Sequence, residues 1–149
     1  MSHKLSSNQM KRPFSLALCI LLVIFISSTA FVFAYTSPGK PQGFVNDFAG
    51  TISSQTKSQL DQQLSSFASQ TGIQVAVVTI PTLADETIEM YAVKLFEEWG
   101  IGGEAKDTGV LFLIAPNDRQ VRIEVGYGLE GVLTDAQSNG IIQKIIIPA

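Results

Sequence analysis

The chain has 149 residues, with 10 Lys and Arg against 13 Asp and Glu, so its formal net charge is −3 at pH 7. Residues 1–34 hold three of the basic residues, no acid, and the only His and Cys, His3 and Cys19. The remaining 115 residues therefore carry 7 basic and 13 acidic side chains, a net charge of −6. Without imidazole or thiol, this body excludes a Ser-His-Asp triad, a Cys-His pair and a His/Cys zinc site. Its acidity argues against nucleic acid as a main partner.

Residues 1–34 have the pattern of an export leader. Lys11 and Arg12 precede an apolar run at 16–26, and small residues follow it. This pattern predicts a signal peptide that is cut after Ala34, with Ala30 as the second choice. The alternative is an uncleaved membrane anchor, because residues 14–35 are long enough to span a bilayer. In both cases the body is exported, and we expect it to be periplasmic, at the cell surface or membrane-anchored.

The rest of the chain divides into a short linker and one domain. Residues 35–43 are rich in Pro and Gly, which predicts an extended linker. Residues 44–149 are enough for a single domain with one core.

Three helices are predicted from caps and apolar spacing. The first begins at the N-cap Ser53 and ends at Gly72. The second is capped by Asp85, and the third starts near Thr134 or Asp135. Their expected inward side chains are Leu60, Leu64, Phe67 and Ala68 in the first; Ile88, Tyr91, Ala92, Leu95, Phe96 and Trp99 in the second; and Ile141, Ile142, Ile145 and Ile146 in the third, which should stop at Pro148.

Three strands are predicted between these helices. The β-branched run at 73–80 and the apolar run at 110–115 are typical of strands buried on both faces. The run at 120–125 alternates, with Arg122 and Glu124 on its wetter face, and follows a short turn at 116–119. The order strand, helix, strand implies a parallel pair, and the turn implies an antiparallel hairpin. We therefore predict an α/β fold, a three-layer α/β/α sandwich with a mixed, mostly parallel sheet that ends in a β-hairpin.

Gly126-x-Gly128-x-x-Gly131 matches the spacing of a dinucleotide-binding fingerprint. However, Glu130 would place a negative charge beside the phosphates, and no residues remain for the second strand and its ribose-binding acid. We expect no nucleotide ligand.

Several carboxylates are expected to gather at one end of the sheet. The hairpin brings residues 126–135 beside the loop that precedes strand 110–115, so Asp107, Glu130 and Asp135 come close together. Carboxylates with a Gly-rich backbone suit a hard cation such as Ca²⁺ or Mg²⁺. Each acid also has an ordinary structural role available, Asp107 in a turn, Glu130 in a solvated loop and Asp135 as a helix cap.

Asp47 has two placements that the sequence leaves open. If the first helix packs antiparallel to the strand after it, Asp47 lies at the opposite end of the sheet, near Asp118. Six extended residues span roughly 20 Å, however, and could return Asp47 to the acidic end.

One block of the sequence is specific: Gly-Tyr-Gly-Leu-Glu-Gly at 126–131, followed by Thr134-Asp135. Further characteristic segments are Val45 to Gly50, Gln74 to Val78, Phe96 to Gly102 and Gly109 to Leu113. With these segments the chain resembles the TPM domain family, in its bacterial branch.

The resemblance implies an α/β/α sandwich, export or membrane attachment, and divalent-cation binding in some members. The family's acidic positions fall on Asp47, Glu130 and Asp135, and Asp107 stands where many members carry an Asn-rich stretch. The family usually continues past the position of Ala149, so we expect the domain to be cut short at its C-terminus. The family label of phosphatase is also implied.

Two functions follow as hypotheses. The first is an exported domain that binds a divalent cation through Asp47, Asp107, Glu130 and Asp135 and serves a membrane protein complex as a binding or maintenance module. The alternative is a metal-assisted phosphatase, in which Arg119 or Arg122 would steady the phosphate. No nucleophile or base is visible in the sequence, and this favours the first.

Overall fold

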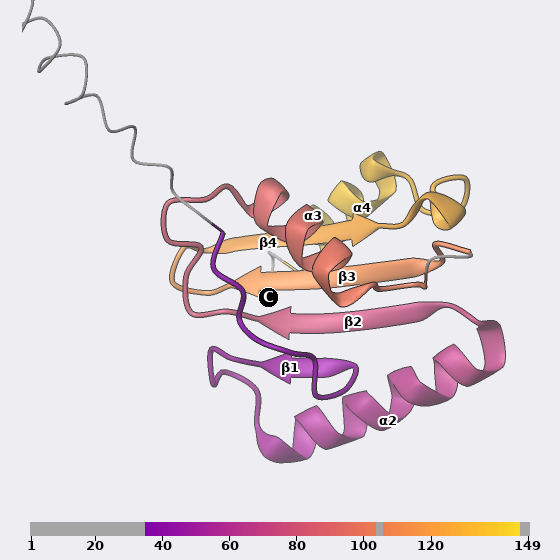
Figure 1. The fold of residues 1–149 in the computed structure, drawn as a ribbon, viewed down its shortest axis with the longest axis horizontal. Helices are drawn as coiled ribbons and strands as arrows, with labels where there is room; N and C mark the ends of the chain where they lie inside the picture. The colour runs from indigo at the N-terminus through magenta and orange to yellow at the C-terminus, as the bar shows by residue number, and fades with distance from the viewer. Residues whose placement is uncertain (1–34, 104–105, 147–149) are drawn as a thin grey trace, which may run out of the picture. The chain divides into compact units, whose positions relative to one another are not determined.

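The computed structural model describes residues 35–103 and 106–146, so the predictions for the leader and for Pro148 lie outside the described part. Four strands form one sheet: β1 (Val45–Asp47), β2 (Gln74–Thr79), β3 (Gly109–Ala115) and β4 (Gln120–Val125). The sheet order is β1-β2-β3-β4 (Figure 1). The first three strands are parallel and β4 is antiparallel to β3, which confirms the mixed sheet and the hairpin.

β1 is a strand that the residue pattern does not predict. It has only three residues, and two of them, Asn46 and Asp47, are polar. Its extended form is fixed by pairing, with Val45 opposite Val77 and Asp47 opposite Thr79. A strand this short forms only because it pairs with β2, so its own residues show no pattern that would predict it.

The helix α2 (Ser54–Thr71) begins and ends as predicted. The Ser53 hydroxyl accepts a hydrogen bond from the amide of Thr56, and Gly72 closes the helix in the left-handed conformation at φ 72°. None of its residues is fully buried, and Phe67 is 41% exposed. Its predicted apolar stripe therefore covers β1 and β2 only in part.

The helix α3 (Ile88–Trp99) is capped by Thr87, so the prediction of Asp85 as the cap is wrong. The chain first makes a turn in which the amide of Glu86 donates to the carbonyl of Leu83, and Ala84 has a positive φ of 56°. This turn buries Leu83 and delays the helix by two residues. The Thr87 hydroxyl then accepts from the amide of Met90.

The third helix is α4 (Asp135–Ile141), and it starts at the predicted position. Thr134 and Gln137 form a capping box at its N-terminus. Its last turn widens into the π-helix η2 (Ile142–Ile146), in which Ile142 is buried.

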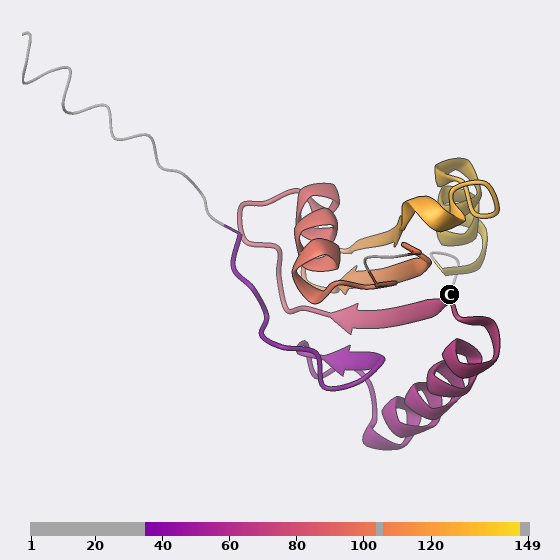
Figure 2. The same ribbon diagram turned by 45° about the vertical axis from the view of Figure 1, so that its right-hand side comes forward.

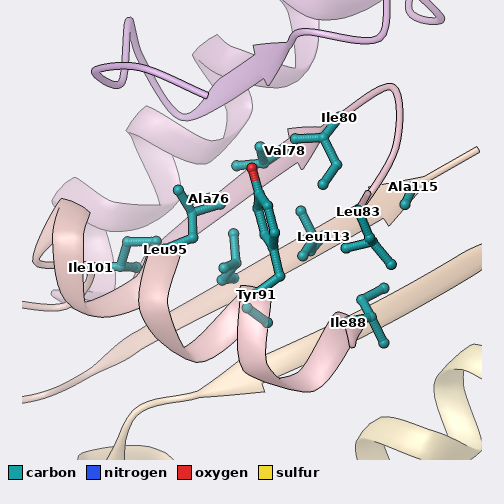
Figure 3. Packing of buried hydrophobic residues seen from close by; sticks show 12 residues of the cluster. Ala76, Val78, Ile80, Leu83, Ile88, Tyr91, Leu95, Ile101, Leu113 and Ala115 are labelled. Carbon is teal, nitrogen blue, oxygen red and sulfur yellow. The ribbon is translucent and has the colours of Figure 1, made fainter. Parts of the chain in front are cut away.

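The main core lies between α3 and one face of β2 and β3, as Figure 3 shows. The predicted core roles of Tyr91 and Trp99 are confirmed, because Tyr91 is buried in this cluster and Trp99 packs against it. The cluster consists of Ala76, Val78, Ile80, Leu83, Ile88, Tyr91, Ala92, Leu95, Ile101, Leu111, Leu113 and Ala115.

β2 and β3 are not buried on both faces, which corrects the prediction from their apolar runs. Burial along β3 alternates: Leu111 and Leu113 are buried, whereas Phe112 and Ile114 are only half-buried. The second face is covered at its two sides, by α2 over β1 and β2 and by α4 near β4. The predicted three-layer α/β/α arrangement is thus confirmed.

The two ends of the sheet carry different loops, and this decides where each acid lies. β3 begins and β4 ends at one end of the sheet, beside the 3-10 helix η1 (Tyr127–Leu129) and α4 (Figures 1 and 2). The opposite end of the sheet holds the C-terminal ends of β1 and β2 and the β3–β4 turn. None of the helices in residues 35–103 and 106–146 combines the length and the hydropathy that a membrane-spanning helix requires.

Residues 35–43, the predicted linker, have no regular secondary structure but lie against α3 rather than free of the domain. We call this segment the strap. The indole nitrogen of Trp99 donates to the carbonyl of Gly39 at 2.9 Å, and Tyr35 packs edge-on against Tyr91 with ring centroids 4.9 Å apart.

Candidate functional site

The loop that contains Asp107 packs tightly on the Gly-rich turn after β4. The amide of Tyr127 donates to Oδ2 of Asp107 at 3.1 Å, and the amide of Gly128 donates to the Asp107 carbonyl at 3.0 Å. Asp107 itself has a positive φ of 48°. Asp107 therefore has the turn role that was the ordinary alternative for it, and it also lines a cleft.

Close backbone approach explains two glycines of the Gly-x-Gly-x-x-Gly pattern. A Cβ on Gly126 would lie 2.3 Å from the carbonyl oxygen of Asp107, and one on Gly128 would lie 2.2 Å from that of Lys106. A Cβ on Gly131 would meet nothing within 4 Å. The first two glycines are thus required by packing within the chain.

Beside this turn is a cleft of about 340 Å³ between the end of α3 and the end of β4. Its apolar wall includes Phe96, Ile101 and Tyr127, and Tyr127 is 81% exposed. Among the residues that the structure describes, its charged lining is acidic and consists of Glu97, Asp107, Glu124 and Glu130. The structure thus brings two of the predicted acids, Asp107 and Glu130, to one cleft.

Glu97 and Glu124 also line the cleft, and neither is among the acids predicted for the site. Glu124 is expected only on the wetter face of its strand, and Glu97 lies in the segment Phe96 to Gly102 that matches the TPM family without an acidic motif of its own. The usable signal was positional, because Glu97 lies three residues before the Gly100 C-cap and Glu124 lies two before Gly126.

Arg122 is paired with one of the acids that line the cleft. Its Nε and Nη2 atoms donate to the same oxygen of Glu124 at 3.1 and 3.0 Å. Nη2 also lies 3.8 Å from Oδ1 of Asp135. The Asp135 side chain is 85% exposed and stands in the first turn of α4, where a negative charge favours the helix. Asp135 is near the acidic cleft but is not among its lining residues.

Asp47 lies at the opposite end of the sheet, the first of its two predicted placements. It pairs with Thr79, which pairs with Ile114, whereas Asp107 precedes Gly109 at the other end of β3. Along β3, Ile114 is five residues beyond Gly109, and each strand residue adds about 3.3 Å. The Asp47 end and the Asp107 end of the sheet are therefore roughly 16 Å apart. The structure does not bring all four predicted ligands together.

The Asp47 carboxylate holds the β1–α2 loop. Oδ2 accepts from the amide of Ile52 at 2.8 Å, and Oδ1 accepts from the amide of Thr51 at 3.1 Å and from the hydroxyl of Thr79. Burial alone would raise the pKa of Asp47, but these hydrogen bonds, led by that of Thr79, outweigh it and lower the pKa. Its oxygens already have partners within the chain.

Across residues 35–103 and 106–146, no three His, Cys, Asp or Glu side chains are arranged to hold a metal ion. The acidic cleft supplies hard oxygen donors of the kind that Ca²⁺ and Mg²⁺ take, but these donors line its walls without converging. A bound cation would have to draw them inward.

Comparison with known proteins gives one family and two solved relatives. The family model of the TPM domain, which carries the label TPM phosphatase, matches residues 45–149. The N-terminal domain of a protein from P. gingivalis, solved by NMR, is 36% identical, with a TM-score of 0.66, covering 70% of this chain and 67% of that one. The N-terminal domain of the cg2496 protein from Corynebacterium glutamicum, also solved by NMR, is 20% identical, with a TM-score of 0.54, covering 76% and 70%, and so supports the fold alone. No curated protein matches.

Proposed function

The chain belongs to the TPM domain family, and from that premise and the acidic cleft we propose that it is an exported module that binds a divalent cation. One observation carries the proposal: within residues 35–103 and 106–146, four carboxylates and no basic side chain line a single cleft. Asp107 and Glu130 are the ligands we expect first, because Glu124 is already paired with Arg122. The bound cation would hold the Asp107 loop against the turn after β4.

The chemistry of the cleft favours Ca²⁺ or Mg²⁺ over softer metals. Carboxylate and backbone carbonyl oxygens are hard donors, and the body of the chain has neither His nor Cys. Asp47 is left out of the proposed ligand set because its oxygens hold the β1–α2 loop. Asp135 is a peripheral charge rather than a ligand in this proposal.

Thermal melts with added Ca²⁺, Mg²⁺ or chelator test the proposal. A ligand that binds the native state at 100 times its Kd stabilises it by about 2.7 kcal/mol, which is a measurable rise in Tm. We expect this rise in the wild type and its loss in Glu130→Gln, whose side chain has no hydrogen-bond partner to disturb within the described residues. Equal Tm values with cation and with chelator would contradict the proposal.

The family label supports phosphate-ester hydrolysis as the second candidate. The two arginines considered for phosphate binding do not favour it. Arg119 lies in the β3–β4 turn at the other end of the sheet, and Arg122 is held by Glu124. We therefore expect no turnover of p-nitrophenyl phosphate above the buffer rate, at acid or neutral pH, with Ca²⁺ or Mg²⁺. Turnover that chelator and Glu130→Gln both abolish would establish the phosphatase instead.

As an exported module, the domain would act next to a membrane protein complex. The leader supports this assignment through its sequence pattern alone. Fractionation of cells that produce the full chain tests it, and recovery of the protein in the cytoplasm would contradict it.

A further inference from the structure

One side of α3 carries an exposed apolar stripe that leads into the cleft. The buried side of this helix faces the core, as Figure 3 shows. Met90 and Val93 are not on that side, and they are 52% and 41% exposed. Val93 lines the cleft, and Met90 lies one turn before it on the same side of the helix. The two side chains therefore form one apolar surface with the cleft wall rather than scattered exposed residues.

The apolar surface continues inside the cleft. Phe96, which is half-buried, and Tyr127, from the turn after β4, both line it. The backbone of Tyr127 is held by the hydrogen bond from its amide to Asp107, whereas the residue is 81% exposed. An exposed aromatic side chain on a fixed backbone is typical of residues that anchor a protein ligand. A divalent cation needs oxygen ligands and leaves this apolar wall unexplained.

Glu97 supplies the charge of the same surface. It lies four residues after Val93, on the same side of α3, and it lines the cleft. Glu124 is paired with Arg122. In contrast, no cation and no hydrogen-bond donor among residues 35–103 and 106–146 contacts the Glu97 carboxylate, which is exposed. Glu97 is therefore available to a basic group from outside the chain.

The stripe is longer than a small ligand that fills the cleft. Met90 and Glu97 are seven residues apart on one helix, which is roughly 10 Å. Met90 lies outside the cleft, whose volume is about 340 Å³. A ligand that covers Met90 and also reaches Glu97 has the dimensions of a polypeptide segment rather than of a single amine.

We propose that this side of α3 is a docking surface for a basic, amphipathic segment of a partner protein. We call it the α3 surface, and it consists of Met90, Val93, Phe96, Glu97 and Tyr127. Apolar side chains of the segment pack on Met90 and Val93, as in the recognition of an amphipathic helix. A Lys or Arg of the segment enters the cleft beside Glu97 and against the ring of Tyr127.

Charge complementarity selects this occupant. The cleft holds four carboxylates, and residues 35–149 carry a net charge of −6, so an acidic segment is repelled. The inference goes beyond the cation proposal, because it depends on the α3 wall of the cleft and not on the two expected ligands, Asp107 and Glu130.

Binding of a fluorescent peptide to the full chain in nonionic detergent micelles tests the proposal. The probe is a short peptide with Lys and Leu at helical spacing, so that it has one basic and one apolar face. Two reference peptides carry Glu in place of every Lys, or Ser in place of every Leu. Fluorescence anisotropy gives the Kd, and empty micelles are the blank. Chelator is present throughout, so the result is independent of cation binding.

Three variants remove one part of the α3 surface each: Glu97→Gln the charge, Val93→Ala the apolar contact and Tyr127→Ala the ring. Two matched controls lie outside it. Glu89→Gln changes an exposed carboxylate of the same helix, and Phe67→Ala changes an apolar side chain of α2 that is 41% exposed, like Val93. Thermal melts check that every variant is folded.

We expect saturable binding of the basic amphipathic peptide and at least roughly tenfold weaker binding of both reference peptides. Glu97→Gln, Val93→Ala and Tyr127→Ala should each raise the Kd roughly fivefold or more, because a few central side chains carry most of the affinity of such surfaces. The two controls should stay within about twofold of the wild type.

Any of three results would overturn the inference. One is no binding of the basic peptide above the blank, and another is binding that either reference peptide equals. The third is a Kd that the three variants leave unchanged although they are folded, which would place the peptide elsewhere. Self-association of the wild type that Val93→Ala abolishes would instead identify a second copy of the chain as the occupant.

Discussion

Replacing Asp47 by Ala should destabilise the domain because this carboxylate holds the β1–α2 loop. The substitution removes the acceptor for the amides of Thr51 and Ile52 and for the Thr79 hydroxyl. Hydrogen bonds to a charged group contribute about 1.5–3 kcal/mol each when they are buried. The site is only partly buried, so we expect a loss of about 2 kcal/mol in the free energy of unfolding at pH 7.

The pH dependence of this loss gives a second signature. The pKa of Asp47 is lower in the folded state, so its contribution is complete above the unfolded value of about 3.9. It disappears as the pH falls through the lowered folded pKa. The difference in stability between the wild type and Asp47→Asn, which keeps the shape but not the charge, should therefore shrink toward zero in acid.

Urea unfolding followed by circular dichroism, in chelator and in Ca²⁺, measures both effects. Asp85→Ala is the control, because Asp85 is exposed and accepts no hydrogen bond within the described residues, and it should change stability by less than about 0.5 kcal/mol. An Asp47→Ala protein as stable as the wild type at pH 7 would refute the loop role. A loss present only in Ca²⁺ would instead make Asp47 a metal ligand.

Two further predictions concern packing, and urea unfolding at pH 7 checks both. Gly128→Ala should cost about 2 kcal/mol or more, because its new Cβ would lie 2.2 Å from a backbone oxygen, whereas Gly131→Ala, with open space around it, should be nearly neutral. Equal effects would contradict the packing account of the glycines. Leu95→Ala should cost about 2–5 kcal/mol, because the Leu95 side chain of α3 is fully buried in the core. Met90→Ala should cost far less, because Met90 of the same helix is 52% exposed. If Leu95→Ala lowered the free energy of unfolding no more than Met90→Ala does, the packing account of the core would be contradicted.

Elements with a strong local signal could be predicted from the sequence. The Ser53 and Gly72 caps, the β3–β4 hairpin and the start of α4 depend on short-range chemistry, and all were located correctly. β1 could not be predicted, because its three residues become a strand only by pairing with β2. The cap of α3 was misplaced because the buried Leu83 imposes a turn before the helix.

Burial of the strands and of the strap depends on tertiary contacts. The apolar runs of β2 and β3 look alike on both faces, yet only the face under α3 is closed. The Pro- and Gly-rich strap reads as a linker, and only the positions of Tyr91 and Glu98 in the fold show what it binds.

Only part of the candidate site can be predicted from the sequence, because the rest depends on tertiary packing. Asp107 and Glu130 follow from topology alone, since the hairpin fixes which loops lie at the same end of the sheet. Two placements for Asp47 remained open because the path of the loop after it is set by its own hydrogen bonds. The sequence offers only the nearness of Glu97 to Gly100 and of Glu124 to Gly126, because the packing of α3 beside β4 is what brings both acids to the cleft.

Titration of the ¹⁵N-labelled protein with Ca²⁺, followed by NMR, tests the cation-binding proposal most directly. We predict saturable shifts of the amide signals of Gly126, Tyr127 and Gly128, which contact the Asp107 loop, and none for Thr51 and Ile52 beside Asp47. Glu130→Gln should raise the Ca²⁺ concentration at half-saturation roughly tenfold, because the number of carboxylates sets the affinity of such sites. Shifts confined to the Asp47 loop, or no saturable shift at millimolar Ca²⁺, would contradict the account.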